Sequence, residues 1–310
     1  MIPTFEDVLA AVPRIEPYLH RTPVLTSATL DAELGAEVFF KCENLQKIGA
    51  FKARGATNAI MALSEENCAR GVITHSSGNH GAAVAFAAAR RDVRCKVVMQ
   101  EGASELKASA IRGYGAEVVL CPKGQRESMT AEIVEKEGMS FVHPFEDPHV
   151  IAGQGTAALE LLDQVPDLDA VITPIGGGGL MSGTTLTFTA RRPEAEIFGA
   201  EPMAVDDAYR SMRDGKLHPG VSNPDTLADG LLTGLGELPF TIMQSRGVEV
   251  VLVDEPGIVE ACKFHLLRMK TLVEPSGATC LAAIRALGDR LKGRRVAAII
   301  TGGNTDLSWL

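Results

Sequence analysis

The chain has 310 residues, 45% of them hydrophobic, and a formal net charge of −9. This length permits one large α/β domain or two smaller ones, and the composition is typical of a globular protein rather than a disordered one. The negative charge balance argues against a nucleic-acid-binding surface.

The cysteine pattern and the N-terminus indicate where the protein resides. No two of the six cysteines have C-x-x-C spacing, which argues against a disulfide framework or structural zinc site and favours reduced thiols. The first residues include acids and lack the apolar core of a secretory signal, and no apolar run is long enough to span a bilayer. We therefore expect a cytoplasmic protein. The cysteines are Cys42, Cys68, Cys95, Cys121, Cys262 and Cys280.

Short β-branched, apolar runs alternate with longer helix-like stretches along the chain. Most of these runs lead into a Gly- or Ser-rich turn and then into an Ala- or Leu-rich segment, which predicts a parallel sheet with helices on its faces. Ligands of such sheets bind beyond the carboxyl ends of the strands, so the turns after strands are the candidate binding segments. Strands are predicted at residues 36–42, 71–75, 95–100, 116–121, 168–175, 195–201, 248–253 and 296–301.

The segment QKIGAFKARGA, residues 46–56, places Lys52 among small residues and beside Phe51. A lysine acts as a nucleophile or proton acceptor only when burial or another cation lowers its pKa. Arg54 is a candidate cation, but at i+2 on a helix it would point away from Lys52. We therefore expect Arg54 to support the helix surface.

Four consecutive glycines, Gly176–Gly179, precede a helix predicted from Leu180 to Arg191. Backbone N–H groups free of side chains at a helix start suit a phosphate, and four glycines cost more chain entropy than a simple turn justifies. The loop is not a Walker motif. The dinucleotide fingerprint also fails, since Met181 or Ser182 stands where its last glycine is required. Glu201, at the end of the next strand, keeps an NAD(P)-dependent oxidoreductase as a remote alternative.

The loop HSSGNHG, residues 75–81, precedes an Ala-rich helix and gathers two hydroxyls, an amide and an imidazole. One serine would be enough to cap that helix. The additional polar groups indicate a loop that binds a carboxylate or a ring oxygen.

A phosphate site, an isolated lysine and a polar loop are the groups that pyridoxal phosphate needs. Over nearly its whole length the chain resembles the serine racemase and serine/threonine dehydratase family of fold-type II pyridoxal-phosphate enzymes. The motifs that carry the resemblance are HRTPVLTS (20–27), KCENLQKIGAFKARGA (41–56), SSGNHG (76–81), YGAEVV (114–119), HPFEDPHVIAGQGT (143–156), PIGGGGL (174–180), EPMAVDDAYRS (201–211), ADGL (228–231), EPSGA (274–278) and TGGN (301–304).

The resemblance implies a two-domain α/β fold like that of the tryptophan synthase β subunit, in which each domain is a mostly parallel twisted sheet flanked by helices. The large, cofactor-binding domain would consist of residues 1–69 and 147–310, and the small domain of residues 70–146. The relatives are mostly homodimers, so a homodimer is expected.

The resemblance also implies which residues bind the cofactor. Lys52 would bind it covalently, Phe51 would pack near its ring, and Asn79 would hydrogen-bond the ring hydroxyl. Thr301 would face the pyridine nitrogen. The residues expected to hold the phosphate are Gly176, Gly177, Gly178, Gly179 and Leu180.

The implied reaction is the β-elimination of water from a 3-hydroxy amino acid, which yields a keto acid and ammonia. Lys52 would remove the Cα proton, and Ser77 on the opposite face of the ring would make a serine racemase instead if it returned a proton. A catalytically inactive protein that binds a phosphate ligand on the same fold is a further alternative. The residues expected to hold the substrate carboxylate are Ser76, Ser77, Asn79 and His80.

The substrate itself stays open between serine, threonine and 3-hydroxyaspartate. Ala50 and Thr301 resemble the branch that dehydrates 3-hydroxyaspartate, and Arg126 aligns with an arginine that can meet a second carboxylate. Phe145 resembles the threonine dehydratases instead. We favour 3-hydroxyaspartate slightly.

The family pattern further implies a structural Mg²⁺ or Ca²⁺ site. Its ligands would be Glu201, Asp207 and the carbonyl oxygen of Val205, and such all-oxygen ligand sets suit hard cations. A solvated acidic turn is the alternative explanation of this segment.

Overall fold

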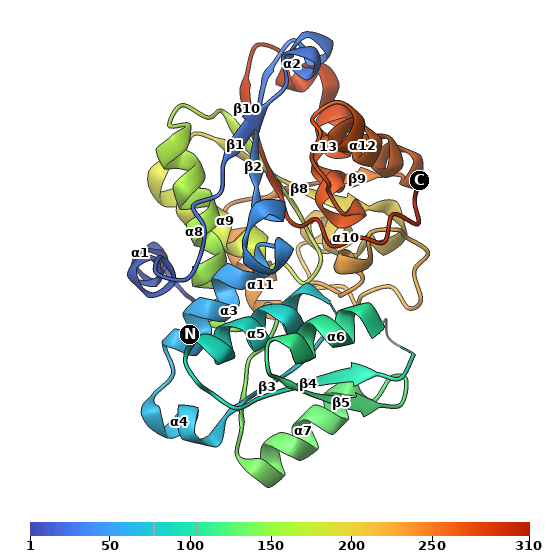
Figure 1. Ribbon diagram of the computed structural model, residues 1–310. Coiled ribbons are helices and arrows are strands. Elements are labelled where there is room, and N and C mark those ends of the chain that lie inside the picture. Colours follow the sequence, from blue (N-terminus) through green and yellow to red (C-terminus); the bar gives the residue numbers. More distant parts are fainter. Residues whose placement is uncertain (77, 103–104) are drawn as a thin grey trace.

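The computed structural model describes residues 1–76, 78–102 and 105–310 (Figure 1). These residues form one six-stranded sheet and one four-stranded sheet, which occupy the upper and lower parts of the view. The predicted α/β class with mostly parallel sheets is therefore confirmed.

The six-stranded sheet is parallel except at one edge, where β1 pairs antiparallel with β2. Strand β10, from near the C-terminus, lies between β2 and β7. This order places the turns that follow β2, β10 and β7 at one edge of the sheet. The strands in spatial order are β1 (Val24–Thr26), β2 (Glu37–Cys42), β10 (Arg295–Ile300), β7 (Ala170–Pro174), β8 (Glu196–Pro202) and β9 (Glu249–Val253).

Alternating side chains of β10 supply both faces of this sheet with apolar surface. Val296 and Ile300 pack in a core under α12 (Glu255–Leu267) and α13 (Pro275–Leu287). Ile299 packs on the other face with α8 (Pro148–Gln164) and α9 (Gly179–Arg191). Helices on both faces explain why the strand is a continuous apolar run.

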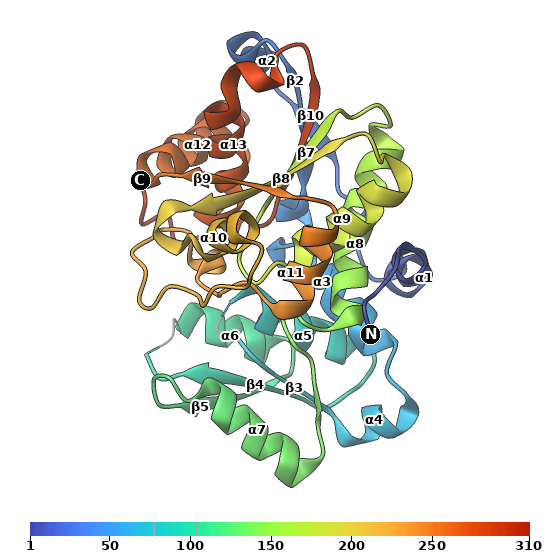
Figure 2. The same ribbon diagram turned by 180° about the vertical axis from the view of Figure 1, so that it is seen from behind.

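The four-stranded sheet is parallel throughout the described residues. Helices α5 (Asn79–Arg90) and α6 (Glu105–Gly113) cover one face together with α3 (Lys52–Met61), and α7 (Arg126–Glu137) covers the other (Figures 1 and 2). Since α3 also packs on α8, it connects the two sheets. The strands in spatial order are β5 (Glu117–Cys121), β4 (Cys95–Gln100), β3 (Val72–His75) and β6 (Ser140–Phe141).

Several further helices complete the fold. They are α1 (Phe5–Ile15), α2 (Ala28–Leu34), α4 (Glu65–Arg70), α10 (Asp207–Asp214), α11 (Glu237–Ser245) and the 3₁₀ helices η1 (Glu43–Leu45), η2 (Lys47–Gly49), η3 (Met203–Val205), η4 (Asp229–Leu231) and η5 (Gly288–Leu291). Of these, α1 packs on α8 and α11 packs on α9. Among the described helices, none is long and apolar enough to cross a membrane.

All eight predicted strands are present, each within two residues of its expected bounds, and the helix predicted from Leu180 starts at Gly179. The short strands β1 and β6 were missed, because two or three residues are too few to display a period-two pattern. The domain boundaries expected near residues 70 and 146 stay a prediction, although every strand of the smaller sheet lies between them.

Candidate active site

Lys52 is the first residue of α3, beyond the carboxyl end of β2. Its half-buried amine donates a hydrogen bond to the carbonyl oxygen of Pro144 at 2.8 Å and lies 5.1 Å from the centre of the Phe51 ring. Burial lowers the pKa of Lys52 to about 8. At pH 7 about a tenth of this amine is neutral, against less than about a thousandth for a free lysine. The lowered pKa therefore arises without a second cation beside it.

Arg54 does point away from Lys52, but the expectation that it lies on the helix surface is wrong. Its side chain is fully buried, and its guanidinium binds the carboxylates of Glu43 and Glu160. The side of α3 that faces away from Lys52 is covered by η1 and α8, and the local sequence carries no sign of these distant partners.

Thr301 directly follows β10 and lies beside the start of α3. The backbone N–H of Phe51 donates to the carbonyl oxygen of Thr301 at 2.9 Å. The hydroxyl of Thr301 is buried and has no hydrogen-bond partner among the described residues. Leaving a buried hydroxyl unpaired is unfavourable, so this group is suited to a ligand atom.

The glycine segment has the geometry of an anion cradle. Gly178 has φ +87°, a conformation that favours glycine, and α9 begins at the next residue. In the described structure, the N–H groups of Gly176, Gly177 and Gly178 donate no hydrogen bond. A Cβ on Gly177 would lie 2.2 Å from Cδ1 of Phe145, so a side chain there is excluded.

These groups fit pyridoxal phosphate. Because β2, β10 and β7 are parallel neighbours, the amine of Lys52, the hydroxyl of Thr301 and the cradle Gly176–Gly179 stand at one edge of one sheet. An amine of lowered pKa suits the aldehyde, unpaired N–H groups at a helix start suit the phosphate, and the unpaired hydroxyl suits the ring nitrogen.

Asn79 begins α5, and its amide is bound to residues from elsewhere in the chain. Its Nδ2 donates to the two carboxylate oxygens of Glu274 at 3.0 and 3.2 Å, and its Oδ1 accepts from Nδ2 of Asn304 at 2.8 Å. The N-cap of α5 is Gly78, for which the described residues supply no side-chain cap, and the hydroxyl of Ser76 accepts the backbone N–H of Gly78 at 3.2 Å. Ser77 lies outside the described residues, and Ser76 is half-buried next to it.

Glu274, which accepts both hydrogen bonds from Asn79, was not singled out by the sequence reasoning. It is buried, its Oε2 also accepts the backbone N–H of Asn304 at 3.2 Å, and burial raises the pKa of its carboxyl to about 7. The available signal was an acid directly before the apolar α13 in EPSGA, but only the fold brings it to Asn79.

His80 lies in the predicted carboxylate-binding loop, but its ring is not a free donor. Nε2 lies 3.1 Å from the carbonyl oxygen of Val142, which can only accept, so Nε2 carries the proton. Burial and the charge of Lys52 hold the pKa of His80 well below its usual value, and the buried Nδ1 has no partner among the described residues. Any part in carboxylate binding would therefore fall to the backbone N–H of His80.

Residues 143–146 form a second segment whose role the sequence reasoning missed. Nδ1 of His143 accepts the backbone N–H groups of Phe145 and Glu146 at 3.3 and 2.9 Å, which folds the segment into a tight turn. The turn places the Pro144 carbonyl at Lys52, the Phe145 ring on the glycine cradle and the Glu146 carboxylate at the start of α11. The motif HPFE thus links the lysine to the glycine cradle.

Arg126 begins α7 at the carboxyl edge of the smaller sheet and is half-buried. After burial, the positive charge of Arg126 is the main cause of the lowered pKa of His75, which ends β3. Arg126 therefore stands at the same sheet edge as the loop 75–81.

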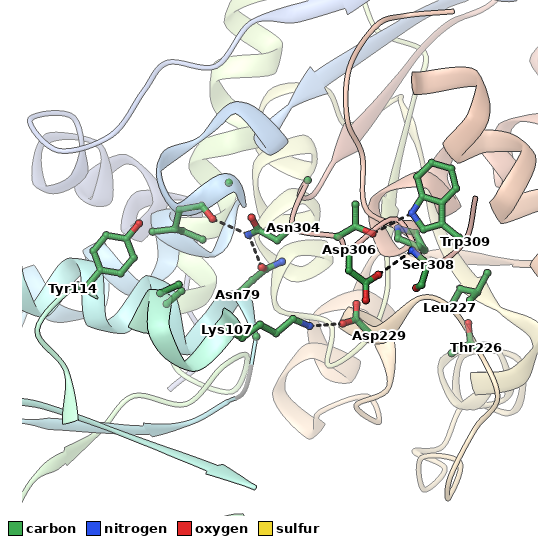
Figure 3. A pocket seen from close by; sticks show the side chains of 18 residues that line it. Asn79, Lys107, Tyr114, Thr226, Leu227, Asp229, Asn304, Asp306, Ser308 and Trp309 are labelled. Carbon is green, nitrogen blue, oxygen red and sulfur yellow. Dashed lines mark hydrogen bonds and ion pairs between the residues drawn. The ribbon is translucent and has the colours of Figure 1, made fainter. Parts of the chain in front are cut away.

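An open cavity of about 840 Å³ lies beside Asn79 (Figure 3). Asn79 and Asn304 line it, and Lys107 of α6 and Asp229 of η4 form an ion pair at 2.8 Å across it. Lys52 and Thr301 are not among its lining residues. The bonded group of Asn79, Glu274 and Asn304 therefore borders the cavity beside the candidate site.

Glu201 and Asp207, the expected metal ligands, are both buried, and neither forms an ion pair with a described residue. Glu201 accepts the backbone N–H groups of Ala208 and Tyr209, which removes the basis for its binding a ribose. Burial raises the pKa of both carboxyl groups, that of Glu201 to about 8. Two buried carboxylates without a cation fit a hard metal ion. Within the described ranges, no three His, Cys, Asp or Glu side chains are grouped to hold a metal.

The lowered pKa of Lys52 predicts its reactivity. In the protein without cofactor, acetylation of Lys52 by acetic anhydride should rise with pH through a midpoint near 8, because only the neutral amine reacts. Free N-acetyl-lysine, with a pKa of about 10.4, is the reference. Mass spectrometry of the peptide that contains residue 52 measures the extent. A midpoint near that of the reference would show that the amine is hydrated.

The raised pKa of Glu274 predicts a pH-dependent stability. The folded state keeps this proton up to about pH 7, whereas the unfolded state loses it near 4.3, so the stability contribution falls as pH rises between these values. From pH 5 to 8, wild type should lose on the order of 3 kcal/mol of unfolding free energy relative to Glu274→Gln. Urea unfolding at a series of pH values measures this difference. Parallel pH profiles for the two proteins would contradict it.

Comparison with known proteins agrees with this geometry. The family model described as "Pyridoxal-phosphate dependent enzyme" matches residues 15–302. The chain is 49% identical to a serine racemase of Dictyostelium discoideum, over 98% of this chain and 96% of that protein. It is 45% identical to a beta-hydroxyaspartate dehydratase of Paracoccus denitrificans, over 100% of this chain and 98% of that protein.

A solved structure shows the same fold over the whole length. The crystal structure of the Dictyostelium discoideum serine racemase superposes with a TM-score of 0.94 at 48% identity, and the match covers 99% of this chain and all of that chain. With the family model matched over most of the sequence and these identities, the chain belongs to the fold-type II family of pyridoxal-phosphate dependent enzymes.

Proposed function

We propose that the protein is a pyridoxal-phosphate-dependent ammonia-lyase, a carbon–nitrogen lyase that dehydrates a 3-hydroxy amino acid to a keto acid and ammonia. The observation that carries the proposal is the amine of Lys52, half-buried and with a pKa of about 8, at the sheet edge that also presents the unpaired hydroxyl of Thr301 and the glycine N–H groups. A relative named beta-hydroxyaspartate dehydratase supports the lyase reaction.

Pyridoxal phosphate, when bound, withdraws electrons from the Cα of an attached amino acid and so makes its proton acidic. Lys52 is the residue proposed to bind the cofactor and then to take this proton, since its amine is neutral often enough near pH 7. Thr301 would face the ring nitrogen with a hydroxyl, which does not force that nitrogen to be charged as a carboxylate would. The Gly176–Gly179 segment and Leu180 would hold the phosphate, Phe51 would pack near the ring, and Asn79 would meet the ring hydroxyl.

For the substrate we propose 3-hydroxyaspartate ahead of threonine and serine. Arg126 stands at the carboxyl edge of the smaller sheet with a half-buried side chain, where it can pair with a second carboxylate. The α-carboxylate is assigned to the loop 76–80. Serine racemase is the second candidate, favoured by the relative of that name, and it would require Ser77 to return a proton to Cα.

Three accompanying proposals concern the whole protein. Buried Glu201 and Asp207 support a structural Mg²⁺ or Ca²⁺ with the carbonyl of Val205 as a third ligand. All six cysteines are free thiols, which supports a reducing cytoplasm. The homodimer expected from the family is a proposal that sedimentation would test.

The reaction is tested by the release of keto acid from L-serine, L-threonine and each stereoisomer of 3-hydroxyaspartate. One hydroxyaspartate isomer should dominate, and Lys52→Ala should lower turnover by about 10³-fold or more and abolish the visible absorbance of the bound cofactor. Lys263→Ala, an exposed lysine on α12, is the control. Chiral analysis of unreacted serine measures racemisation. Full turnover by Lys52→Ala would refute the mechanism.

Substrate selection is tested by Arg126→Ala. Loss of a charge-assisted hydrogen bond to the second carboxylate should lower kcat/KM for 3-hydroxyaspartate by about 10- to 100-fold and leave that for serine within a few-fold. Arg112→Ala, an exposed arginine on α6, is the matched control. Equal loss on both substrates would remove Arg126 as the specificity residue.

The metal proposal is tested by thermal unfolding with a chelator and with Mg²⁺ or Ca²⁺. A cation at a hundredfold excess over its Kd should stabilise wild type by about 2.7 kcal/mol. Glu201→Gln should lose this gain, whereas Asp206→Asn should keep it, because Asp206 pairs with Arg210 instead. No response of wild type to either chelator or cation would refute the site.

A further inference from the structure

A buried charge cluster, defined by Lys41, Glu43, Arg54 and Glu160, lies behind α3 on the side away from Lys52. The side chains of Lys41, Glu43 and Arg54 are fully buried, and that of Glu160 is 21% exposed. Two cations and two carboxylates balance in charge. Neither Lys52 nor any group assigned to substrate or cofactor belongs to this cluster.

Arg54 is the centre of the cluster. Its Nε and Nη2 donate to the two oxygens of Glu43 at 2.7 and 2.8 Å, and its Nη1 and Nη2 donate to the two oxygens of Glu160 at 2.8 Å each. Nη1 also reaches the hydroxyl of Thr156 at 3.2 Å. Arg54 binds both carboxylates in bidentate fashion, a geometry that a lysine amine cannot adopt. The position of Arg54 is therefore defined from two sides.

The two carboxylates come from different parts of the fold. Glu43 belongs to η1, directly after β2, and Glu160 belongs to α8. Arg54 is the third residue of α3, two residues after Lys52. The guanidinium therefore ties the first turn of α3 to the sheet on one side and to α8 on the other.

Besides Arg54, Gln154 of α8 holds this first turn, because its Oε1 accepts the backbone N–H of Gly55 at 3.1 Å. The N-cap residue Phe51 has helical dihedral angles and no capping side chain, and the backbone N–H of Phe51 is bound to the carbonyl of Thr301. The backbone N–H groups of Ala53 and Arg54 donate to the carbonyl oxygens of Ala50 and Phe51 at 3.3 and 2.9 Å. The side chain of Arg54 adds ion pairs that attach this turn to η1 and α8.

The contact between α3 and α8 is joined by a few polar side chains, and Arg54 is one of them. A Cβ on Gly55 would lie 2.6 Å from the carbonyl oxygen of Val150, and one on Gly153 would lie 2.7 Å from the carbonyl oxygen of Arg54. The two helices therefore approach closely at these glycines, next to the side chain of Gln154. The ion pair between Arg54 and Glu160 and the hydrogen bond from Nδ2 of Asn58 to the carbonyl oxygen of His149 at 2.7 Å also join the two helices.

Buried ion pairs are weak evidence for stability, because well-packed apolar residues often serve a fold equally well. The advantage of a buried ion pair over apolar packing is that it holds its partners in one defined geometry. Burial is also the cause of the lowered pKa of Lys52, and the charge of Arg54 makes no resolved contribution to it. Arg54 can therefore influence Lys52 only by fixing where its amine lies, and not by an electrostatic effect on its pKa.

We propose that Arg54 is a positioning residue, which clamps the first turn of α3 between Glu43 and Glu160 and thereby holds the Lys52 amine at its place beside Pro144. This inference rests on the proposed role of Lys52 as the lysine that binds the cofactor. It goes beyond that role by naming the residue that keeps Lys52 in place.

The test compares two variants that each change one of the two cations bound to Glu160. Arg54→Lys keeps a positive charge on α3, but its amine cannot bind two carboxylates in bidentate fashion. Lys41→Met removes the lysine of β2, whose Nζ binds Glu160 at 2.7 Å, and leaves α3 untouched. Both changes weaken the same buried cluster, so urea unfolding should record a loss of stability for both. A purely structural role predicts that the two variants behave alike in every other respect.

The positioning role predicts that they differ at Lys52. In apo-protein, Arg54→Lys should shift the pH midpoint of Lys52 acetylation upward from about 8, since a displaced amine is better hydrated. In holoenzyme it should lower kcat by about 10- to 100-fold with KM within a few-fold. Lys41→Met should keep the wild-type midpoint and kcat. Glu43→Gln, which keeps the shape of the carboxylate, should reproduce the effects of Arg54→Lys and replaces it if that variant does not fold.

Two outcomes overturn the inference. One is a wild-type midpoint and kcat in both Arg54→Lys and Glu43→Gln. The other is the same shift in Lys41→Met, which would assign the effect to general loss of cluster stability. Failure of the proposed function is separate, because it would appear as full activity of Lys52→Ala, whatever the Arg54 variants do.

Discussion

Parallel pairing of β2, β10 and β7 is the constraint on which the rest of the site depends. Ile300 pairs with Cys42 and Ala298 with Ile172, so the three strands end at nearly the same level. The segments that follow them carry Lys52, Thr301 and the glycine cradle. These residues are more than a hundred positions apart in sequence, and one shared register brings them to a single edge.

The interior polar groups divide into two kinds. In the buried charge cluster, each carboxylate and each cation is bound by a partner of opposite charge. At the candidate site, the hydroxyl of Thr301 and Nδ1 of His80 are buried without a partner in the described structure. Satisfied polar networks define geometry, whereas unsatisfied groups raise the energy of the folded chain until a ligand pairs with them. The buried charge cluster lies on one side of α3, and Lys52 begins that helix.

Local patterns were enough for much of the fold. The alternating apolar runs predicted eight strands, and the glycines before α9 predicted an anion cradle whose N–H groups are indeed free. Contacts between distant segments escaped this reasoning. Arg54 was misplaced because helix geometry says which way a side chain points but not what covers it. Glu274 was missed because its partner Asn79 is almost two hundred residues away.

Residue type and spacing therefore determined the class of fold and the glycine segment before α9, since each depends on neighbours within a few positions. Tertiary structure alone decided the state of the titratable groups. Burial against Pro144 lowers the pKa of Lys52, and burial beside Asn79 raises that of Glu274. The clamp of Glu43 and Glu160 on Arg54 likewise exists only in the folded chain. Desolvation and ion pairing depend on everything that surrounds a group in space, and a linear sequence does not record those surroundings.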